Sequence, residues 1–179
     1  SGGAGILISD AAEDLNLPMP ELEQNAQSKL KEALSFAAVK NPVDCTAQVI
    51  NQPELADQFL STMLDTQQYP SILAFFAHAA GTASIEAKLR PELKKAVDKH
   101  PDHLFALSII AEKDTIARYE ADGFSVFEDP IRATKAIHHM GVLGTAFARP
   151  DALIPFEKKA VAALASTPDE AQAKLILEE

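Results

Sequence analysis

The sequence predicts an α/β protein in which helices alternate with the strands of a parallel sheet. Apolar residues make up 47% of the 179 residues, which is enough for a packed core. The continuous apolar run at residues 71–77 is typical of a strand buried on both faces, and residues 103–110 predict another apolar strand. Amphipathic helical patterns stand between and after these runs, and such alternation indicates right-handed crossovers between parallel strands.

The first half of the chain carries three predicted helices and one short extended segment. A glycine-rich turn, residues 2–5, runs into a helix over residues 5–15, and a second helix covers residues 23–34. Residues 39–46 hold β-branched side chains and a proline, which predicts a short strand or an extended segment, followed by a turn. Pro53 starts a third helix.

The second half continues the alternation. A long helical stretch runs from Thr82 to about Lys99, in which Pro91 forms either a kink or the first turn of a second piece. A helix over residues 113–122 is expected to end at Gly123. A short strand over residues 125–127 and a helix from Pro130 to about residue 140 follow.

Four strands are thus expected, and a further strand ahead of Ser1 would give the five of a flavodoxin-like, doubly wound sheet. We expect the sequence to be a piece of a longer polypeptide that begins directly after this missing first strand. Upstream residues could supply the strand, a neighbouring chain could fill its place, or the sheet could close up with loss of stability. Past residue 140 the pattern predicts a linker and a helical extension.

Composition excludes several classes of function. The net charge of −10 offers no basic stripe for nucleic acid. The sequence has neither the apolar run of a transmembrane helix nor a signal peptide, so we expect a cytoplasmic protein. Cys45 is the single cysteine and excludes an internal disulfide; it is expected to be a small buried residue at a strand end rather than a reactive thiol.

The candidate binding residues follow predicted strands, because ligands of open parallel sheets collect at the carboxyl ends of the strands. They are Gly2, Gly3, Gly5, Asn41, Asp44, Gly81 and Thr82. Backbone N–H groups at a helix start favour an anion, although a tight strand-to-helix turn explains the first glycines equally well. The alternative for Asp44 is a cap on nearby backbone N–H groups.

The histidines do not form a recognisable site. His78 follows a buried strand but has no identifiable carboxylate partner, so a structural role is favoured. His138 and His139 are adjacent on a helix and point in different directions. His100 and His103 flank a turn and are expected to be solvated. We assign no catalytic residue and no metal site.

Several stretches, in this order and spacing, resemble the second flavodoxin-like ligase domain of the NDP-forming acyl-CoA synthetases, relatives of succinyl-CoA synthetase that include the ADP-forming acetyl-CoA synthetases. They are SGGAG with the helix after it, KNPVDCTA, SILAFFAH and ALSIIAEKDTIARYEADGFSVFEDPIRATKAI. The resemblance covers residues 1–140. Residues 141–166 are then a linker and helix, and residues 167–179 resemble the start of an ATP-grasp domain.

The resemblance implies that the parent protein is an acid–thiol ligase in which an acid, CoA and a nucleoside triphosphate give an acyl-CoA, a nucleoside diphosphate and phosphate through a phosphohistidine. The phosphorylated histidine, the CoA site and the nucleotide site belong to other domains of the same polypeptide, so this piece is expected to bind no cofactor and to be inactive alone. The parent would use ATP or GTP, Mg²⁺ and CoA.

The resemblance also implies that this domain offers a helix start near Gly81 and Thr82 to the phosphohistidine. One glycine stands here where relatives of succinyl-CoA synthetase carry two, so a close backbone approach to phosphate is less assured. The alternative is the same module as a regulatory, ligand-sensing part of a fused protein acetyltransferase. Neither nucleic acid nor a membrane is an expected partner, and assembly as a homo-oligomer stays open.

Overall fold

The computed structural model describes residues 2–148, 169, 170 and 174. The chain divides into two units, Ser1–Thr145 and Ala146–Glu179, and the fold described below is that of the first. Most of the expected linker, and of the expected start of an ATP-grasp domain, lies outside the described residues.

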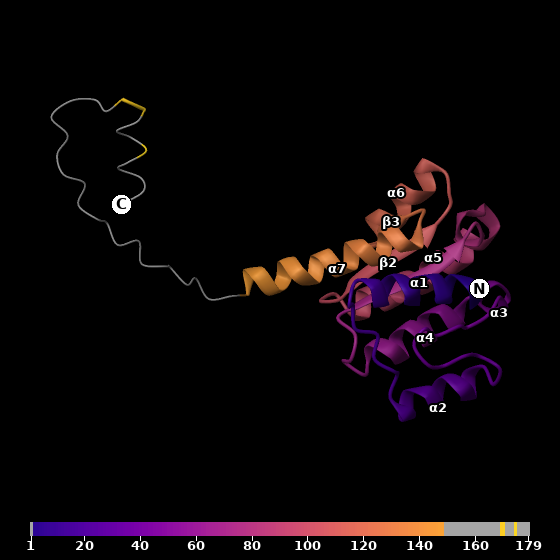
Figure 1. Ribbon diagram of the computed structural model, residues 1–179. Helices are drawn as coiled ribbons and strands as arrows, with labels where there is room; N and C mark the ends of the chain where they lie inside the picture. Colours follow the sequence, from indigo (N-terminus) through magenta and orange to yellow (C-terminus); the bar gives the residue numbers. More distant parts are fainter. Residues whose placement is uncertain (1, 149–168, 171–173, 175–179) are drawn as a thin grey trace. The chain divides into compact units, whose positions relative to one another are not determined.

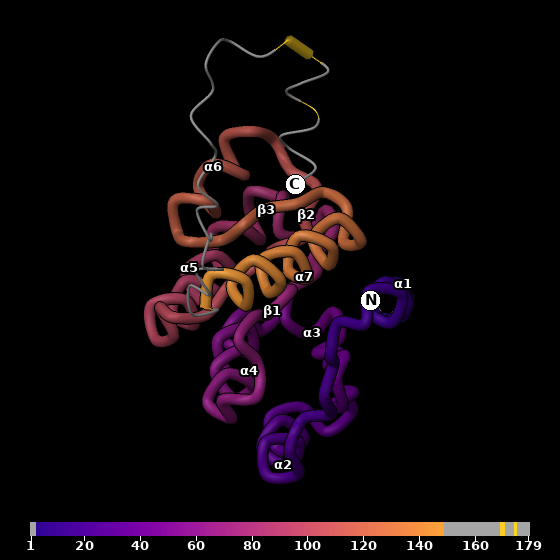
Figure 2. Tube along the Cα trace, turned by 60° about the vertical axis from the view of Figure 1, so that its left-hand side comes forward, coloured from indigo at the N-terminus to yellow at the C-terminus, as the bar shows by residue number. Residues whose placement is uncertain are grey.

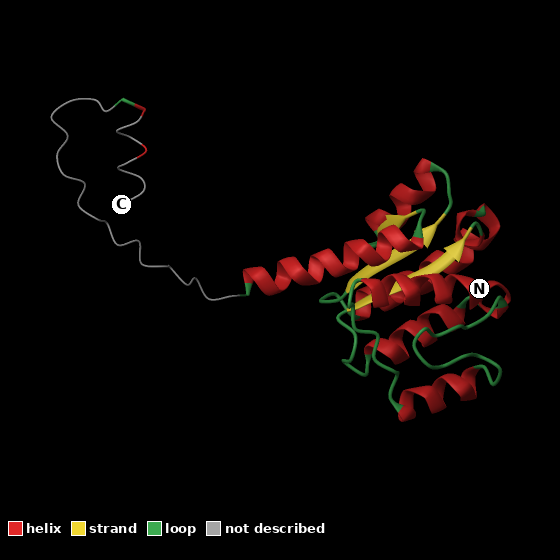
Figure 3. Ribbon diagram, in the orientation of Figure 1, coloured by secondary structure: helices red, strands yellow, loops and turns green. Residues whose placement is uncertain are grey.

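A three-stranded parallel sheet forms the centre of the first unit (Figure 3). Its strands are β1 (Ser71–Ala77), β2 (Leu104–Ile109) and β3 (Ser125–Phe127), in the order β1-β2-β3. The helices are α1 (Gly2–Asp14), α2 (Gln24–Ala33), α3 (Gln48–Asn51), α4 (Glu54–Leu64), α5 (Ala83–Lys99), α6 (Lys113–Ala121) and α7 (Pro130–Phe147), and a 3₁₀ turn, η1 (Ala79–Gly81), precedes α5 (Figure 1). The predicted α/β class with a parallel, flavodoxin-like sheet is confirmed.

Helices cover both faces of this sheet. Helices α4, α5 and α6 lie on one side of the strands, and α1 and α7 lie on the other (Figure 2). Helix α5 is continuous through Pro91 and buries Leu89, Leu93 and Ala96. Strand β2 is buried along almost its whole length, because it has a hydrogen-bonded neighbour at each edge.

Of the two alternatives for residues 39–46, the structure shows the extended segment and not a strand of the sheet. This segment forms an isolated antiparallel bridge between Ala38 and Asp44, whose backbone groups exchange N–H···O bonds of 3.1 and 2.8 Å. Pro42, which follows a cis peptide bond, lies in the loop that this bridge closes. The segment satisfies its backbone within itself and does not join the sheet, so the described residues hold three strands and not four.

Two predicted boundaries also differ from the structure. The glycine turn of residues 2–5 belongs to α1 itself, which begins at Gly2 because burial of Ala4 offsets the low helix propensity of the glycines. Helix α7 continues to Phe147, beyond the expected end near residue 140. Gly123, with a φ of 101°, ends α6 as predicted, and its N–H donates to the carbonyl of Glu120.

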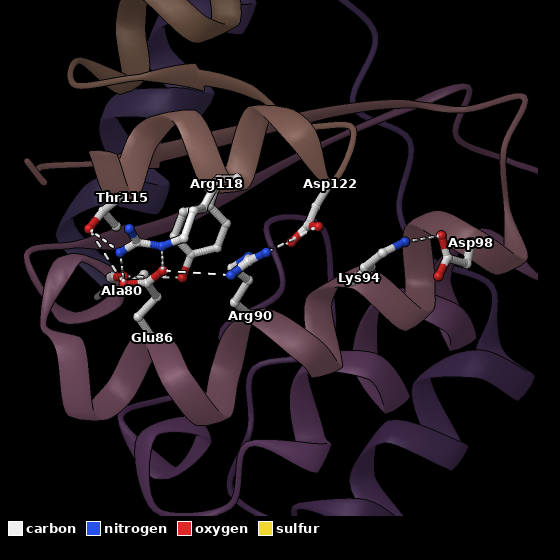
Figure 4. A network of polar contacts seen from close by, with 9 residues as sticks. Ala80, Glu86, Arg90, Lys94, Asp98, Thr115, Arg118 and Asp122 are labelled. Carbon is white, nitrogen blue, oxygen red and sulfur yellow. Dashed lines mark hydrogen bonds and ion pairs between the residues drawn. The ribbon is translucent and has the colours of Figure 1, made fainter. Parts of the chain in front are cut away.

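A polar network joins α5 to α6 (Figure 4). The carboxylate of Glu86 accepts two hydrogen bonds from Arg118, of 2.6 and 2.7 Å, although the glutamate is only 5% exposed. Arg90, one turn further along α5, pairs with Asp122. The buried hydroxyl of Tyr119 donates to the carbonyl of Ala80 at 3.1 Å, which ties α6 to the turn that precedes α5. These contacts hold the start of α5 in place.

Candidate functional site

The carboxyl ends of the three strands define one edge of the sheet, since the strands are parallel. Strand β1 leads into η1 and α5, β2 leads into α6, and β3 leads into α7. The segment 78–82, which holds Gly81 and Thr82, and the segment 111–114 therefore lie at the same edge, where ligands of open parallel sheets bind.

The loop of residues 41–46 and the first turn of α1 lie next to each other. A Cβ atom built on Gly5 would stand 3.5 Å from the Cβ of Pro42. Both segments line a cavity of about 950 Å³ together with Ala77 and Ala79, at the end of β1. The structure thus brings Gly5, Asn41 and Asp44 together around one cavity. Gly3 lies in the same first turn of α1, exposed and with open space around it.

The polar side chains of this loop are occupied within the chain. The carboxylate of Asp44 accepts the backbone N–H of Thr46 at 2.8 Å, so the capping alternative describes this aspartate. The hydroxyl of Thr46 accepts the N–H of Gln48 at 3.2 Å. The side-chain amide of Asn41 donates to the carbonyl of Pro20 at 3.3 Å. These bonds shape the loop around the cavity.

Gly81 is packed against the segment that leaves β2. A Cβ atom at Gly81 would collide with the carbonyl oxygen of Ile110 and stand 2.9 Å from the Cβ of Ala111. The N–H groups of Gly81 and Thr82 donate to the carbonyls of His78 and Ala79, at 3.2 and 3.1 Å. The missing side chain thus permits close packing inside the domain, and both amides are used in the turn.

The amides at the start of α5 lie one step further along the chain. The first bonds of this helix run from Ile85 and Glu86 back to the carbonyl of Thr82, at 2.9 and 2.8 Å. The N–H groups of Ala83 and Ser84 precede these bonds, and such groups have no partner inside a helix. They carry the positive end of the dipole of a 17-residue helix.

Charge distinguishes the three helix starts at this edge. Helix α6 begins between Glu112 and Asp114, and α7 begins after Glu128 and Asp129. The one acidic residue in the first turn of α5 is Glu86, whose charge is paired with Arg118. The hydrogen bonds from Arg118 hold the pKa of Glu86 below its ordinary value. An anion therefore meets the least repulsion at the start of α5.

The histidines do not come together in a catalytic or metal site among the described residues. His78 is exposed, and the rings of His138 and His139 stack edge to face on α7. The prediction that His100 and His103 are solvated is wrong: their rings are in edge-to-face contact, and the His100 side chain is 10% exposed with its Nε2 3.5 Å from Asp65. Among the residues that the structure describes, no group of three or more His, Cys, Asp or Glu side chains could hold a metal ion.

Cys45 lies half-buried on the loop and lines the cavity. Burial, and secondly the charge of Asp44, raise the pKa of its thiol above the ordinary value of 9.0. A raised thiol pKa disfavours the reactive thiolate, so the structure agrees with the expectation of an unreactive cysteine. The residue stands in a loop and not at a strand end.

Sequence reasoning missed the cavity and the apolar side chains that line it. Ile8 projects from α1, and Phe59 and Met63 project from α4. Each reads in the sequence as an ordinary core position of an amphipathic helix. Among the described strands β1 has a hydrogen-bonded neighbour on one edge only, and α1 and α4 line the space beside its other edge.

The site and the sheet define a class, a flavodoxin-like α/β domain with its candidate site at the carboxyl edge of the strands. No family model matches the chain. Trans-feruloyl-CoA synthase FCS1, from an unknown prokaryotic organism, is 32% identical over 75 residues, which cover 41% of this chain and 11% of that protein.

Two solved structures have the same fold. A dinucleotide-forming acetyl-coenzyme A synthetase 1 of Ca. Korarchaeum cryptofilum, in the apo form, matches with a TM-score of 0.69 and 14% identity, over 82% of this chain and 32% of that one. PH0766 of Pyrococcus horikoshii OT3 matches with a TM-score of 0.70 and 21% identity, over 83% of this chain and 35% of that one. The predicted resemblance to a CoA-ligase domain is confirmed at the level of the fold, and the chain spans about a third or less of each of these proteins.

No helix among the described residues combines the length and the apolar character that crossing a membrane requires.

Proposed function

We propose that this chain is part of an NDP-forming acyl-CoA synthetase, an enzyme that makes an acyl-CoA from an acid, CoA and a nucleoside triphosphate through a phosphohistidine. The observation that carries the proposal is the sequence match to trans-feruloyl-CoA synthase FCS1. The fold shared with an acetyl-coenzyme A synthetase supports it. The chain alone is expected to be inactive, because the phosphorylated histidine and the CoA and nucleotide sites would lie in other domains.

The role proposed for this domain is to stabilise the phosphoryl group at the start of α5. The N–H groups of Ala83 and Ser84 have the geometry of an anion site at a helix N-terminus. The neighbouring helix starts are less suitable because Glu112, Asp114, Glu128 and Asp129 surround them. Gly81 and Thr82 would act indirectly, by holding the turn that aims these amides.

The proposed partners are the other domains of the same polypeptide: a CoA-binding domain, a ligase domain with the phosphohistidine and an ATP-grasp domain that binds ATP or GTP with Mg²⁺. The exposed apolar side chains on the last turns of α7 support such contacts. Met140, Val142 and Leu143 are 55%, 53% and 49% exposed, and Phe147 is 83% exposed. Large exposed apolar groups of this kind are typical of surfaces that meet another domain.

Two proline variants of the full-length protein test the role of α5. Ala83→Pro removes one N–H from the start of α5 at the position where helices tolerate proline, and the extended backbone of Thr82, with φ −80° and ψ 123°, accommodates it. We expect turnover to fall by roughly 10- to 100-fold, the effect of one hydrogen bond to a charged group. Lys113→Pro is the matched control at the start of α6 and should leave turnover nearly unchanged.

The assay measures acyl-CoA formation from acetate or ferulate and separates the nucleotide products. Nucleoside diphosphate and phosphate are the expected products. Formation of a nucleoside monophosphate and pyrophosphate would contradict the proposed class. Transfer of an acetyl group to a protein would contradict it as well. Equal turnover of the two proline variants would contradict the role of α5.

A further inference from the structure

A buried carboxylate lies in the first turn of α5. The N–H of Glu86 donates to the carbonyl of Thr82 at 2.8 Å, and the Glu86 side chain is 7% exposed. The N–H groups of Ala83 and Ser84 belong to the same turn. Like charges repel, and salt screens a buried charge less than an exposed one. Without a compensating cation, Glu86 would therefore oppose an anion at these two amides.

Arg118 of α6 supplies the compensating charge. Its Nε and Nη2 donate to the two carboxylate oxygens of Glu86, at 2.6 and 2.7 Å. The Nη2 also donates at 2.9 Å to the hydroxyl of Thr115, in the first turn of α6. Figure 4 shows these side chains meeting between α5 and α6. The guanidinium thus joins the first turns of two helices that begin at the carboxyl edge of the sheet.

Arg90 is the second cation near this carboxylate, and its charge is used elsewhere. Its Nη1 lies 3.9 Å from the Oε1 of Glu86, too far for a hydrogen bond, and its Nε donates to the carboxylate of Asp122. The hydrogen bonds from Arg118 lower the pKa of Glu86, so this glutamate is charged at neutral pH. The net charge beside the start of α5 therefore depends on Arg118.

We propose that the Glu86–Arg118 pair regulates anion binding at the start of α5. Arg118 is a positioning residue: it neutralises Glu86 and does not touch the anion. A displacement of α6 that draws Arg118 away would leave a buried negative charge in the first turn of α5 and release the anion. The inference rests on the proposed function for the place of the anion, and it adds the residues that control the site.

The test measures binding of inorganic phosphate to the 179-residue chain through the amide NMR shifts of Ala83 and Ser84. Glu86→Gln keeps Arg118 and removes the repelling charge, so it should tighten phosphate binding about tenfold. This is the effect of one unit charge roughly 10 Å away near a protein surface. Arg118→Met leaves Glu86 uncompensated and should weaken binding by a similar factor.

Two further variants separate charge from shape. The double variant, with both Glu86→Gln and Arg118→Met, carries neither charge and should bind phosphate with nearly native affinity. Lys95→Met removes a cation about three turns further along α5, where the lysine side chain is 53% exposed. Its phosphate affinity should hardly change. If Arg118→Met fails to fold, Glu86→Gln and the double variant still decide the question.

The sign of the Glu86→Gln effect is the sharpest result. A merely structural pair holds the turn in shape, so its loss would weaken phosphate binding in both single variants and overturn the proposal. A double variant as weak as Arg118→Met would also overturn it, because Arg118 would then contact the anion itself. So would a native chain that binds no phosphate at Ala83 and Ser84.

Failure of the proposed function is seen in a different measurement. The full-length protein would then form no acyl-CoA together with a nucleoside diphosphate. The order of the phosphate affinities does not depend on that assay, so each conclusion can fail without the other.

Discussion

The two edges of β1 face very different surroundings. Toward β2 the sheet is closed: Phe105 and Leu107 are 2% and 0% exposed, and the Glu86 network fixes the helices above. Toward α1 the same strand borders a cavity of about 950 Å³, and Leu73 and Phe75 stay half-exposed. The residues on both sides are equally apolar. The difference therefore comes from whether the sheet continues, and not from local composition.

This comparison separates two uses of apolar sequence. On the closed side each apolar group already contributes to stability. On the open side the same kind of group stays partly exposed to solvent, so its burial contributes less to stability. Paired substitutions across β1 can measure the difference directly.

The largest contrast is expected for two leucines in adjacent strands. Leu107 pairs with Ala74 across the ladder, and Leu73 pairs with Ala106. Leu107→Ala leaves a hole in a fully buried place and should lower the free energy of unfolding by about 3–4 kcal/mol. Leu73→Ala only enlarges an existing cavity and should cost about 1 kcal/mol. Urea unfolding of the two variants gives both values, and equal costs would show that the open side is packed after all.

The second contrast is between two glycines. Gly81→Ala forces a Cβ against the carbonyl of Ile110 and the Cβ of Ala111, and should destabilise the domain by about 2–3 kcal/mol. Gly3→Ala, in α1, meets no atom within 4 Å and should be neutral or stabilise by up to about 1 kcal/mol through helix propensity. Thermal unfolding followed by circular dichroism compares them. A harmless Gly81→Ala would mean that the packing of η1 on the exit from β2 is loose.

Sequence reasoning was most reliable where one local signal decides the structure. The strand at residues 71–77 follows from an apolar run, and the cap at Gly123 follows from a glycine at the end of a helical pattern, where the structure shows a positive φ. The short strand at residues 125–127 was also predicted. It left residues 39–46 open between a strand and an extended segment, because such a pattern cannot tell whether a backbone will pair with a sheet or with itself, as Ala38 and Asp44 do.

The candidate site shows the same limit. The position of the helix start near Gly81 could be predicted, since it depends on strand order and chain direction. The purpose of Gly81 could not be, because the backbone that approaches it, at Ile110, belongs to a segment that only the fold brings near. The pairing of Glu86 with Arg118 is hidden for the same reason: the two residues lie 32 positions apart.

The smallest contrast tests that pair on the closed side. Glu86→Gln removes the charge that accepts two hydrogen bonds from Arg118, and should lower the melting temperature at neutral pH by roughly 2–4 °C. Glu92→Gln is the control on the same helix. Its partner Lys95 has a side chain 53% exposed, and exposed pairs contribute little, so the melting temperature should hardly change.

The pH dependence of the same variants separates charge from packing. The hydrogen bonds from Arg118 lower the pKa of Glu86 below 4.5, so the unfolded chain binds a proton here more readily than the folded one. The stability from this pair is therefore fully present above pH 4.5 and is lost as the pH falls through the lowered pKa. The melting temperatures of the native chain and of Glu86→Gln should converge as the pH falls through the lowered pKa of Glu86, because both side chains are then neutral. A difference in melting temperature that stays constant from neutral to acidic pH would show that the shape of the side chain, and not its charge, causes the effect. The closed side would then be stabilised by apolar packing alone.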